Sequence, residues 1–171
     1  MHAFSVGTPG LQLIISLYFV ANTYTQIHLH IVFAVQGRYA AIPLAHAERL
    51  YRYITGIITE RGQKLLAING MPDHLHLLIG LRPDMALAEL MRDVKASSSK
   101  FINEQHWVAG KFAWQAGYGA FSYSVSQLPD VIRYIEGQQA HHHRQTFQEE
   151  YRSMLDKFGI DYDPRYVFSA D

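Results

Sequence analysis

The sequence predicts an α+β protein, a ferredoxin-like sandwich in which an antiparallel sheet carries helices on one face. Segments with strand and helix periodicity follow one another in the order strand, helix, strand, strand, helix, strand, with further helices at the end. The length of 171 residues suits a single domain. A hydrophobic content of 49% with 18% charged residues excludes an intrinsically disordered chain.

The first strand is predicted over residues 23–35. Hydrophobic side chains occupy alternate positions there, and the side chains between them include His28 and His30, which point to the other face. A helix is predicted over residues 43–61, because apolar side chains recur at steps of three and four residues and Gly62 stands where a helix can end. These two elements open the predicted order.

Two strands and a second helix are predicted next along the chain. The strands are predicted over residues 64–68 and 74–81, and the Gly70 and Pro72 between them suit a tight turn. The helix is predicted to begin after Asp84, a residue type that caps helices well. Apolar side chains then recur at helical spacing, which indicates that one side of this helix packs against the sheet.

The last third of the chain is predicted to hold one strand and two helices. The strand lies within residues 112–125, which are rich in aromatic residues and glycine. Ser126 is a candidate N-cap for the next helix, with Pro129 in its first turn, and a final helix is predicted over residues 145–158. No internal repeat interrupts this order.

Charge and cysteine content exclude several classes of protein. Fifteen Lys and Arg balance fifteen Asp and Glu, so any surface for DNA must come from a local patch rather than from net charge. The chain has no Cys, which excludes disulfides, thiol catalysis and Cys-based metal sites and fits a reducing compartment. Ten His are the unusual feature, because His is the commonest metal ligand.

Residues 1–22 are predicted to be an extension of uncertain status ahead of a single domain over residues 23–171. The apolar run over residues 11–20 is too short for a membrane-spanning helix, and no Lys or Arg precedes it. The run has the length of a signal-peptide core, but secretion is disfavoured because a basic n-region and a good cleavage site are missing. It fits either a short strand or docked arm, or an upstream extension of the reading frame with the native start near Val20. We expect a cytoplasmic protein, without a membrane partner.

His74 and His76 are a candidate metal site. Residues two apart on a strand point to the same face, so the two imidazoles can hold one cation. His28 and His30 repeat the pattern, and buried, hydrogen-bonded histidines are the alternative interpretation for both pairs. The first and third strands are neighbours in a ferredoxin-like sheet, but the register that decides whether the pairs meet is open.

Tyr134 and Gln138 lie four residues apart, on one flank of a predicted helix. They fit either a boundary aromatic with a solvated amide or a phenolic nucleophile beside a neutral oxygen ligand. A phenol of pKa about 10 is a poor nucleophile at neutral pH unless a cation polarises its target or a base takes its proton. The functional interpretation therefore requires a cation nearby.

The run His141, His142 and His143 follows this helix. Consecutive helical residues diverge by about 100°, so the three imidazoles cannot bind one ion together while the segment is helical. A solvated helix end is the expected interpretation, with cations near the carboxyl end of the helix dipole. His142 alone continues the line of Tyr134 and Gln138.

A basic and hydroxyl-rich patch is predicted on the second helix and just beyond it. Cations and hydroxyls bind phosphates, and the neighbouring aromatic residues could stack on unpaired bases. A solvated helix face beside ordinary core aromatics is the equally weighted alternative. The candidate nucleic-acid contacts are Arg38, Arg92, Lys95, Ser99, Lys100 and Lys111, and the aromatic residues are Trp107, Trp114 and Tyr118.

Together these segments resemble the small single-tyrosine HUH transposases, the insertion-sequence and repeat-associated enzymes that cut single-stranded DNA. The resemblance is specific because a His-hydrophobe-His motif is followed by Tyr-x-x-x-Gln within a helix. The matching stretches, in the family's order, are YTQIHLHIVFAV from Tyr24, MPDHLHLLIG from Met71, DVKASSS from Asp93, WQAGYGAFS from Trp114 and YIEGQ from Tyr134.

The resemblance implies a role for each candidate residue. His74, His76 and Gln138 would bind a divalent metal, Mg²⁺ or Mn²⁺, and Tyr134 would attack a phosphodiester to form a 5′-phosphotyrosine. It implies a DNA transposase that cuts and rejoins single-stranded DNA at hairpin-marked element ends, a homodimer, and association with the nucleoid during the reaction. Family members often carry Lys after the first strand, where Arg38 is the nearest cation here.

Two other functions stay open at this stage. One is a catalytically silent protein on the same fold that binds nucleic-acid hairpins. The other is a small-molecule metalloenzyme built from both His pairs, which predicts zinc retention. A covalent complex between the protein and a hairpin oligonucleotide in Mn²⁺ separates the transposase from both.

Overall fold

The computed structural model describes residues 24–38, 42–141, 145–163 and 167. These residues form one four-stranded antiparallel sheet in the order β2-β3-β1-β4. The strands are β1 (His28–Ala34), β2 (Lys64–Met71), β3 (His74–Gly80) and β4 (Gly119–Tyr123). Since β1 and β3 are the central pair, as a ferredoxin-like sheet requires, the predicted fold class is confirmed.

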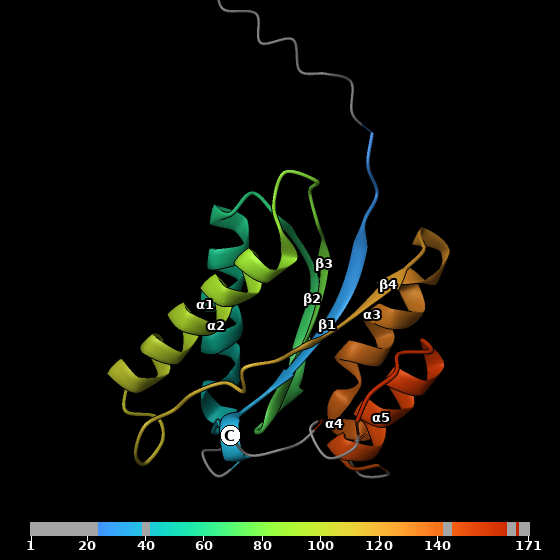
Figure 1. Ribbon diagram of the computed structural model, residues 1–171. Helices are drawn as coiled ribbons and strands as arrows, with labels where there is room; N and C mark the ends of the chain where they lie inside the picture. Colours follow the sequence, from blue (N-terminus) through green and yellow to red (C-terminus); the bar gives the residue numbers. More distant parts are fainter. Residues whose placement is uncertain (1–23, 39–41, 142–144, 164–166, 168–171) are drawn as a thin grey trace, which may run out of the picture.

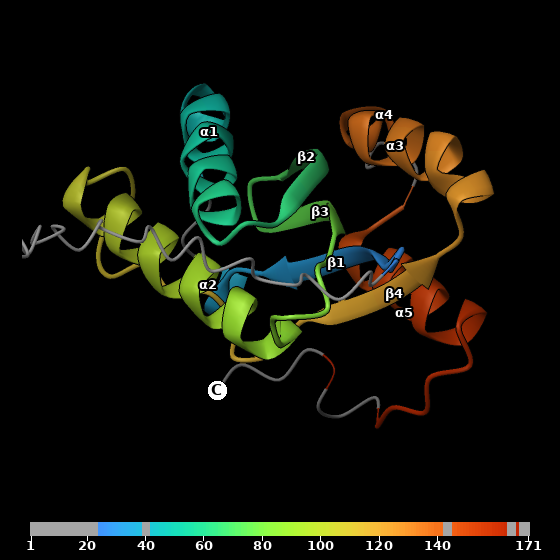
Figure 2. The same cartoon turned by 90° about the horizontal axis from the view of Figure 1, so that it is seen from above.

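Helices cover both faces of the sheet (Figure 1 and Figure 2). One face carries α1 (Leu44–Glu60) and α2 (Leu87–Glu104), the two helices expected from the ferredoxin-like order. The other carries α3 (Leu128–Glu136), α4 (Gln138–His141) and α5 (Phe147–Lys157), whereas the sequence predicted helices on one face alone. Short 3-10 turns, η1 (Gln36–Arg38) and η2 (Val125–Gln127), follow β1 and β4.

The core between the sheet and α1 and α2 confirms the predicted alternation of strand side chains. Side chains at alternate positions of β1 and β3 point into it and are almost fully buried. Apolar residues at helical spacing on α1 and α2 pack against them. The core is built from Ile31, Phe33, Leu75, Leu77 and Ile79 of the strands and Leu50, Ile54, Ile58, Leu90 and Val94 of the helices.

The second face is apolar in part as well, which is the physical reason that helices cover it. Val32 and Phe121 are buried under α5, where Phe147 and Met154 pack on them. Leu78, Ala67, Val131 and Ile135 form a similar cluster under α3. Leaving these side chains in water would forfeit about 25 cal/mol per Å² of apolar surface, so the C-terminal helices complete the fold.

Turns and helix caps differ from the predicted ones in detail. The N-cap of α2 is Ala86, and Asp84 instead accepts a hydrogen bond from Arg82 at 2.8 Å. Ser124, not Ser126, forms the capping box that precedes α3, together with Gln127. No helix within the described ranges is long and apolar enough to cross a membrane.

The turn between β2 and β3 sets the position of His74. It consists of Pro72 and Asp73, and β2 runs on to Met71, beyond the predicted end at residue 68. A Cβ atom at Gly70 would lie 2.3 Å from the carbonyl oxygen of His74, so only glycine allows this close approach. The tight turn thus delivers His74 as the first residue of β3.

Candidate active site

His74 and His76 point from β3 toward the face that α3 and α5 cover. Both side chains are fully buried, and the ring of His74 stacks on Phe147 of α5 with centroids 4.2 Å apart. Their position follows from the strand period, because the residues between and after them point into the core on the other face. The predicted pairing of the two imidazoles on one face is confirmed.

The Nδ1 atom of each imidazole has a partner. His74 Nδ1 donates to Asp73 Oδ1 at 2.8 Å, and His76 Nδ1 lies 2.9 Å from Nε2 of His30 on β1. Burial lowers the pKa of His30 to about 4, so at neutral pH its ring is uncharged and can accept a hydrogen bond at Nε2. Both site imidazoles can therefore present a basic Nε2 inward, the arrangement that metal-binding histidines need.

His30 is a residue whose contribution the sequence left open. The register places Val32 opposite His76, so His30 and His76 are diagonal neighbours on the two central strands. Their rings stack with centroids 5.1 Å apart. His28 lies on the same face but outside the group of candidate ligand atoms found among the described residues, so the two His pairs do not form one four-histidine site.

The hydrogen bond that His30 accepts from His76 predicts an effect on metal affinity. His30→Phe keeps an aromatic ring but removes the acceptor for His76, and we expect Mn²⁺ affinity to fall about tenfold or more. His30→Gln, whose amide oxygen can reach the place of Nε2, is the conservative variant and should restore most of it. Isothermal titration with Mn²⁺ measures the affinity of both variants. Equal Mn²⁺ affinities of His30→Phe and the wild type would contradict a role of His30 in positioning His76.

His30 also predicts a pH dependence of stability in metal-free protein. The unfolded chain protonates His30 below about pH 6.5 and the folded chain only below about 4, so stability falls as pH drops through this window. The loss attributable to His30 reaches about 3 kcal/mol by pH 4. Urea unfolding in EDTA between pH 7.5 and 4 measures this loss of stability. An identical dependence of the unfolding free energy on pH in His30→Phe would refute the assignment to His30.

Gln138 begins α4, directly after α3 ends. The end of α3 is held to the sheet by Asn69, whose Nδ2 donates to the carbonyl of Glu136 at 2.9 Å. The Gln138 side chain is fully buried, and its Oε1 has no hydrogen-bond partner among the residues that the structure describes. Because buried amide oxygens rarely lack a partner, this atom fits a cation ligand.

Tyr134 lies one turn before Gln138, on the same flank of the helical segment. Its ring centroid is 6.0 Å from that of His76, and its hydroxyl donates a hydrogen bond to Glu150. It lines a cleft of about 390 Å³ together with His30, Tyr123 and Glu150. Burial, with a further contribution from the Glu150 carboxylate, raises the pKa of Tyr134 above its ordinary value.

Glu150 of α5 is a member of the site that the sequence interpretation missed. Its Oε1 also accepts a hydrogen bond from Gln138 Nε2 at 3.0 Å, and its two oxygens lie 3.8 Å from Nε2 of His74 and of His76. A signal was present, because Glu150 falls between Phe147 and Met154 on the apolar side of its helix. A carboxylate at such a position indicates a buried polar site.

The donor set fits a divalent cation. Ligand atoms of His74, His76 and Glu150 all lie within 4.8 Å of one another. Two atoms that bind one ion at about 2.1 Å each lie at most about 4.2 Å apart, so the 3.8 Å separations allow a common ion. Imidazole, amide and carboxylate ligands together suit Mn²⁺ at least as well as Mg²⁺.

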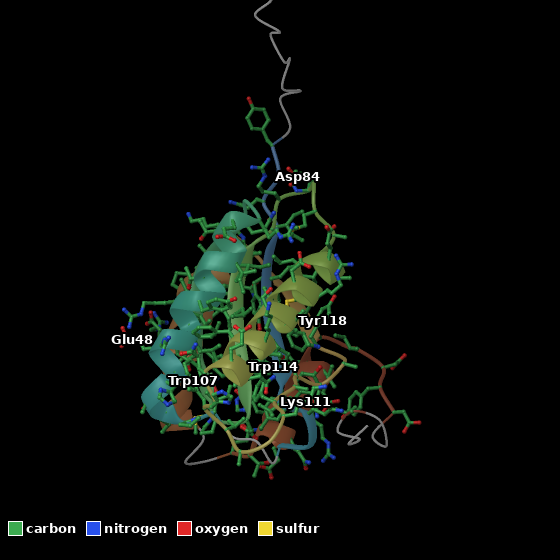
Figure 3. The ribbon with its side chains drawn as sticks, turned by 90° about the vertical axis from the view of Figure 1, so that its left-hand side faces the viewer. Glu48, Asp84, Trp107, Lys111, Trp114 and Tyr118 are labelled. Atoms are coloured by element: carbon green, nitrogen blue, oxygen red, sulfur yellow. The ribbon has the colours of Figure 1, made fainter. Side chains whose placement is uncertain are left out.

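Four of the predicted nucleic-acid contacts, Arg92, Lys95, Ser99 and Lys100, belong to α2, which covers the opposite side of the sheet. Lys111 and the aromatic residues Trp107, Trp114 and Tyr118 follow α2 in the chain and are labelled in Figure 3. Arg92, Lys95 and Ser99 line a groove of about 380 Å³ with Trp114 and Tyr118. Lys95 Nζ donates to the carbonyls of residues 116 and 117 at 2.7 and 3.0 Å, and burial lowers its pKa. Part of this cation's hydrogen-bonding capacity therefore holds the loop before β4.

The other members of this set differ in their surroundings. Trp114 is a core residue, since its Nε1 donates to Ser98 Oγ at 2.9 Å and its ring packs on Phe33. Lys100 pairs with Glu104 at 3.8 Å, and Lys111 is exposed. Arg38 lies in η1, and its side chain is outside the described part of the chain. The side chains of His141, His142 and His143 are outside it too.

Comparison with known proteins decides the family. The model of the family described as "Transposase IS200 like" matches residues 23–138, more than half of the chain. The chain belongs to the IS200-like transposases. The match includes His74, His76, Tyr134 and Gln138, and it ends before Glu150. As a member of this family the protein is a DNA-processing enzyme, which agrees with the resemblance found in the sequence.

Relatives of this IS200-like transposase match it at low sequence identity. The ISDra2 transposase TnpA of Deinococcus radiodurans is 24% identical over 120 residues, which cover 66% of this chain and 84% of that protein. A crystal structure of a putative transposase from the same organism has a TM-score of 0.54 at 24% identity, covering 68% of this chain and 94% of the other. A REP-associated tyrosine transposase bound to a REP hairpin also has a TM-score of 0.54, at 16% identity, covering 86% and 93%.

Proposed function

We propose that this IS200-like transposase cuts and rejoins single-stranded DNA at hairpin-marked ends through a covalent bond to Tyr134. The observation that carries the proposal is the meeting of five side chains from three separate parts of the chain. Tyr134 and Gln138 both hydrogen-bond to Glu150, which lies 3.8 Å from His74 and from His76. Binding of a REP hairpin by the related REP-associated transposase supports hairpin DNA as the substrate class.

We propose His74, His76 and Gln138 as holders of a divalent ion. The ion, when bound, would polarise the scissile phosphodiester and neutralise part of its charge. The protein orients the ligands, because Asp73 and His30 engage the outer nitrogens of the two imidazoles. The Oε1 of Gln138, which has no hydrogen-bond partner in the part of the chain that the structure describes, supports its role as the neutral oxygen ligand.

Tyr134 would act as the nucleophile. A bond forms between its phenolic oxygen and phosphorus, and the bond from phosphorus to the 3′ oxygen breaks. The phenol loses a proton and the departing 3′ oxygen gains one, so a 5′-phosphotyrosine and a free 3′-hydroxyl result. Because the phosphodiester energy is kept in the protein link, attack by another 3′-hydroxyl reverses the step and joins strands without ATP.

A homodimer, implied by the resemblance, is part of the proposal. Tyr134 and the two histidines already meet within one chain, so we propose that a second subunit serves DNA binding rather than completing the site. Light scattering of the full chain with and without hairpin DNA tests this. A mass of one subunit under both conditions would remove the dimer.

The groove along α2 is proposed as a place for the DNA backbone. Arg92 and Ser99 line this groove, and Lys95 contributes less because it serves the carbonyls of the neighbouring loop. Lys100 lies on α2 and Lys111 on the segment that follows it, and both are exposed. Arg38 is a further candidate for a contact with the DNA backbone. Phosphate contacts predict weaker binding at higher salt, with a shallower dependence after each substitution that removes a contact.

Covalent trapping tests the proposed function. The full chain is incubated in Mn²⁺ with a pool of single-stranded oligonucleotides that carry a hairpin stem and randomised flanks, and the products are separated in SDS. We expect the 3′-labelled pool to yield a protein-bound band and the 5′-labelled pool a shortened free strand ending in a 3′-hydroxyl. Hydrolysis products alone, without a protein-bound band, would contradict the proposal.

A further inference from the structure

Glu150 occupies a position where a carboxylate is costly. It is 6% exposed and lies on the side of α5 where Phe147 and Met154 pack on the sheet. Burying an ionised carboxylate requires partners that compensate for the loss of water. Its neighbour Glu149 is exposed and serves the capping box with Thr146, so the helix start does not need a second acidic residue.

The side-chain contacts described here for Glu150 lead to the candidate active site. Oε1 accepts hydrogen bonds from the Tyr134 hydroxyl and from Gln138, and it lies 3.8 Å from His76 Nε2. Oε2 lies 3.8 Å from His74 Nε2. The carboxylate is thus surrounded by the proposed nucleophile and by all three proposed ligands.

We propose that Glu150 is a fourth protein ligand of the divalent ion, bound through its carboxylate. The inference deepens the proposed function and rests on it for the need for an ion. His74, His76 and Gln138 offer only uncharged donor atoms when they bind a cation, whereas Mg²⁺ and Mn²⁺ favour carboxylate oxygen. Glu150 supplies the negative charge that the other three lack, and it ties α5 to the site.

A ligand role has a geometric consequence. The same carboxylate that binds the ion also holds the Tyr134 hydroxyl and the Gln138 amide group. Metal binding would therefore draw α3, α4 and α5 to one point, although α3 and α5 pack on the sheet in two different apolar clusters. We expect Mn²⁺ to raise the melting temperature of the wild-type protein and to do so less in a variant without the carboxylate.

Titration with Mn²⁺ in the absence of DNA tests the proposal. We expect Glu150→Gln to bind Mn²⁺ about tenfold or more weakly than the wild type, since an amide of the same shape lacks the charge. Glu149→Gln is the matched control on the adjacent residue, and it should bind within twofold of the wild type because Gln also fits a capping box. Isothermal titration gives the affinities, and Mn²⁺ electron paramagnetic resonance reports free ion independently.

The outcomes separate a ligand from a residue that merely holds its neighbours. The amide oxygen of Glu150→Gln can still accept the Tyr134 hydrogen bond, so Mn²⁺ affinity within twofold of the wild type would overturn the proposal. Absence of Mn²⁺ binding by the wild type would overturn it too. If Glu150→Gln does not fold, as judged by circular dichroism, Glu150→Asp is titrated instead. Its side chain is one methylene shorter, so its carboxylate cannot reach the place of the Glu150 carboxylate. A Mn²⁺ affinity equal to that of the wild type would therefore refute the ligand role.

Metal binding and DNA cleavage are read separately in this design. A covalent complex from the wild type together with unchanged Mn²⁺ affinity in Glu150→Gln would sink the ligand proposal and leave the proposed function standing. Weaker Mn²⁺ binding in Glu150→Gln with no covalent complex from the wild type would leave the ligand role of Glu150 standing and contradict the proposed function.

Discussion

Tyr134→Phe is expected to form no SDS-stable complex with hairpin DNA, while its affinity for the hairpin stays within about twofold of the wild type. The substitution removes one oxygen atom and leaves the ring, which packs beside the cluster under α5 and near the rings of His30 and His76. Removal of a nucleophile costs about a thousandfold or more in other enzymes that act through covalent intermediates. The loss should therefore appear in chemistry and not in binding.

Tyr123 provides the matched control for this experiment. Its side chain lines the same cleft, at the end of β4, and burial raises its pKa as well. Tyr123→Phe should keep at least a large part of the covalent complex, because the hydroxyl that donates to Glu150 at the site is that of Tyr134. A covalent band that persists in Tyr134→Phe and disappears in Tyr123→Phe would transfer the nucleophile to Tyr123.

His76→Ala is expected to lose both Mn²⁺ binding and cleavage while it keeps the fold. His76 lies at the centre of the site, within hydrogen-bonding distance of His30 and 3.8 Å from Glu150. Deleting a proposed ligand leaves too few protein donors for a tight site, and we expect affinity for Mn²⁺ to fall about a hundredfold. Titration of Mn²⁺ and the covalent assay are carried out on the same preparation.

The fold of His76→Ala can be checked apart from its activity. The buried cavity and the lost partner of His30 cost about 1–3 kcal/mol, which a domain of this size tolerates in most cases. His28→Asn is the control, because His28 lies on the same face of β1 but outside the group of ligand atoms. Cleavage of hairpin DNA at the wild-type rate by a folded His76→Ala would remove the metal assignment.

Local periodicity accounts for most of what the sequence predicted correctly. The order of strands and helices follows from apolar spacings of two and of three to four residues, which depend on neighbouring residues alone. The same spacings placed His74 beside His76, as the structure has them, and Tyr134 beside Gln138 on one helix. Tyr134 and Gln138 do meet at Glu150, but Gln138 opens α4 because α3 already ends at Glu136. The family resemblance rested on these two pairs, and the match over residues 23–138 agrees with it.

Contacts between distant segments were decided by the tertiary structure. A shift of one residue between β1 and β3 would have turned His30 away from His76, and no local pattern sets that register. Glu150 reaches the site because α5 docks on the second face of the sheet, through Phe147 and Met154. The sequence by itself determined which side chains stand together on each element. Only long-range packing decided which elements meet, since the free energy of docking belongs to the whole core and not to any one segment.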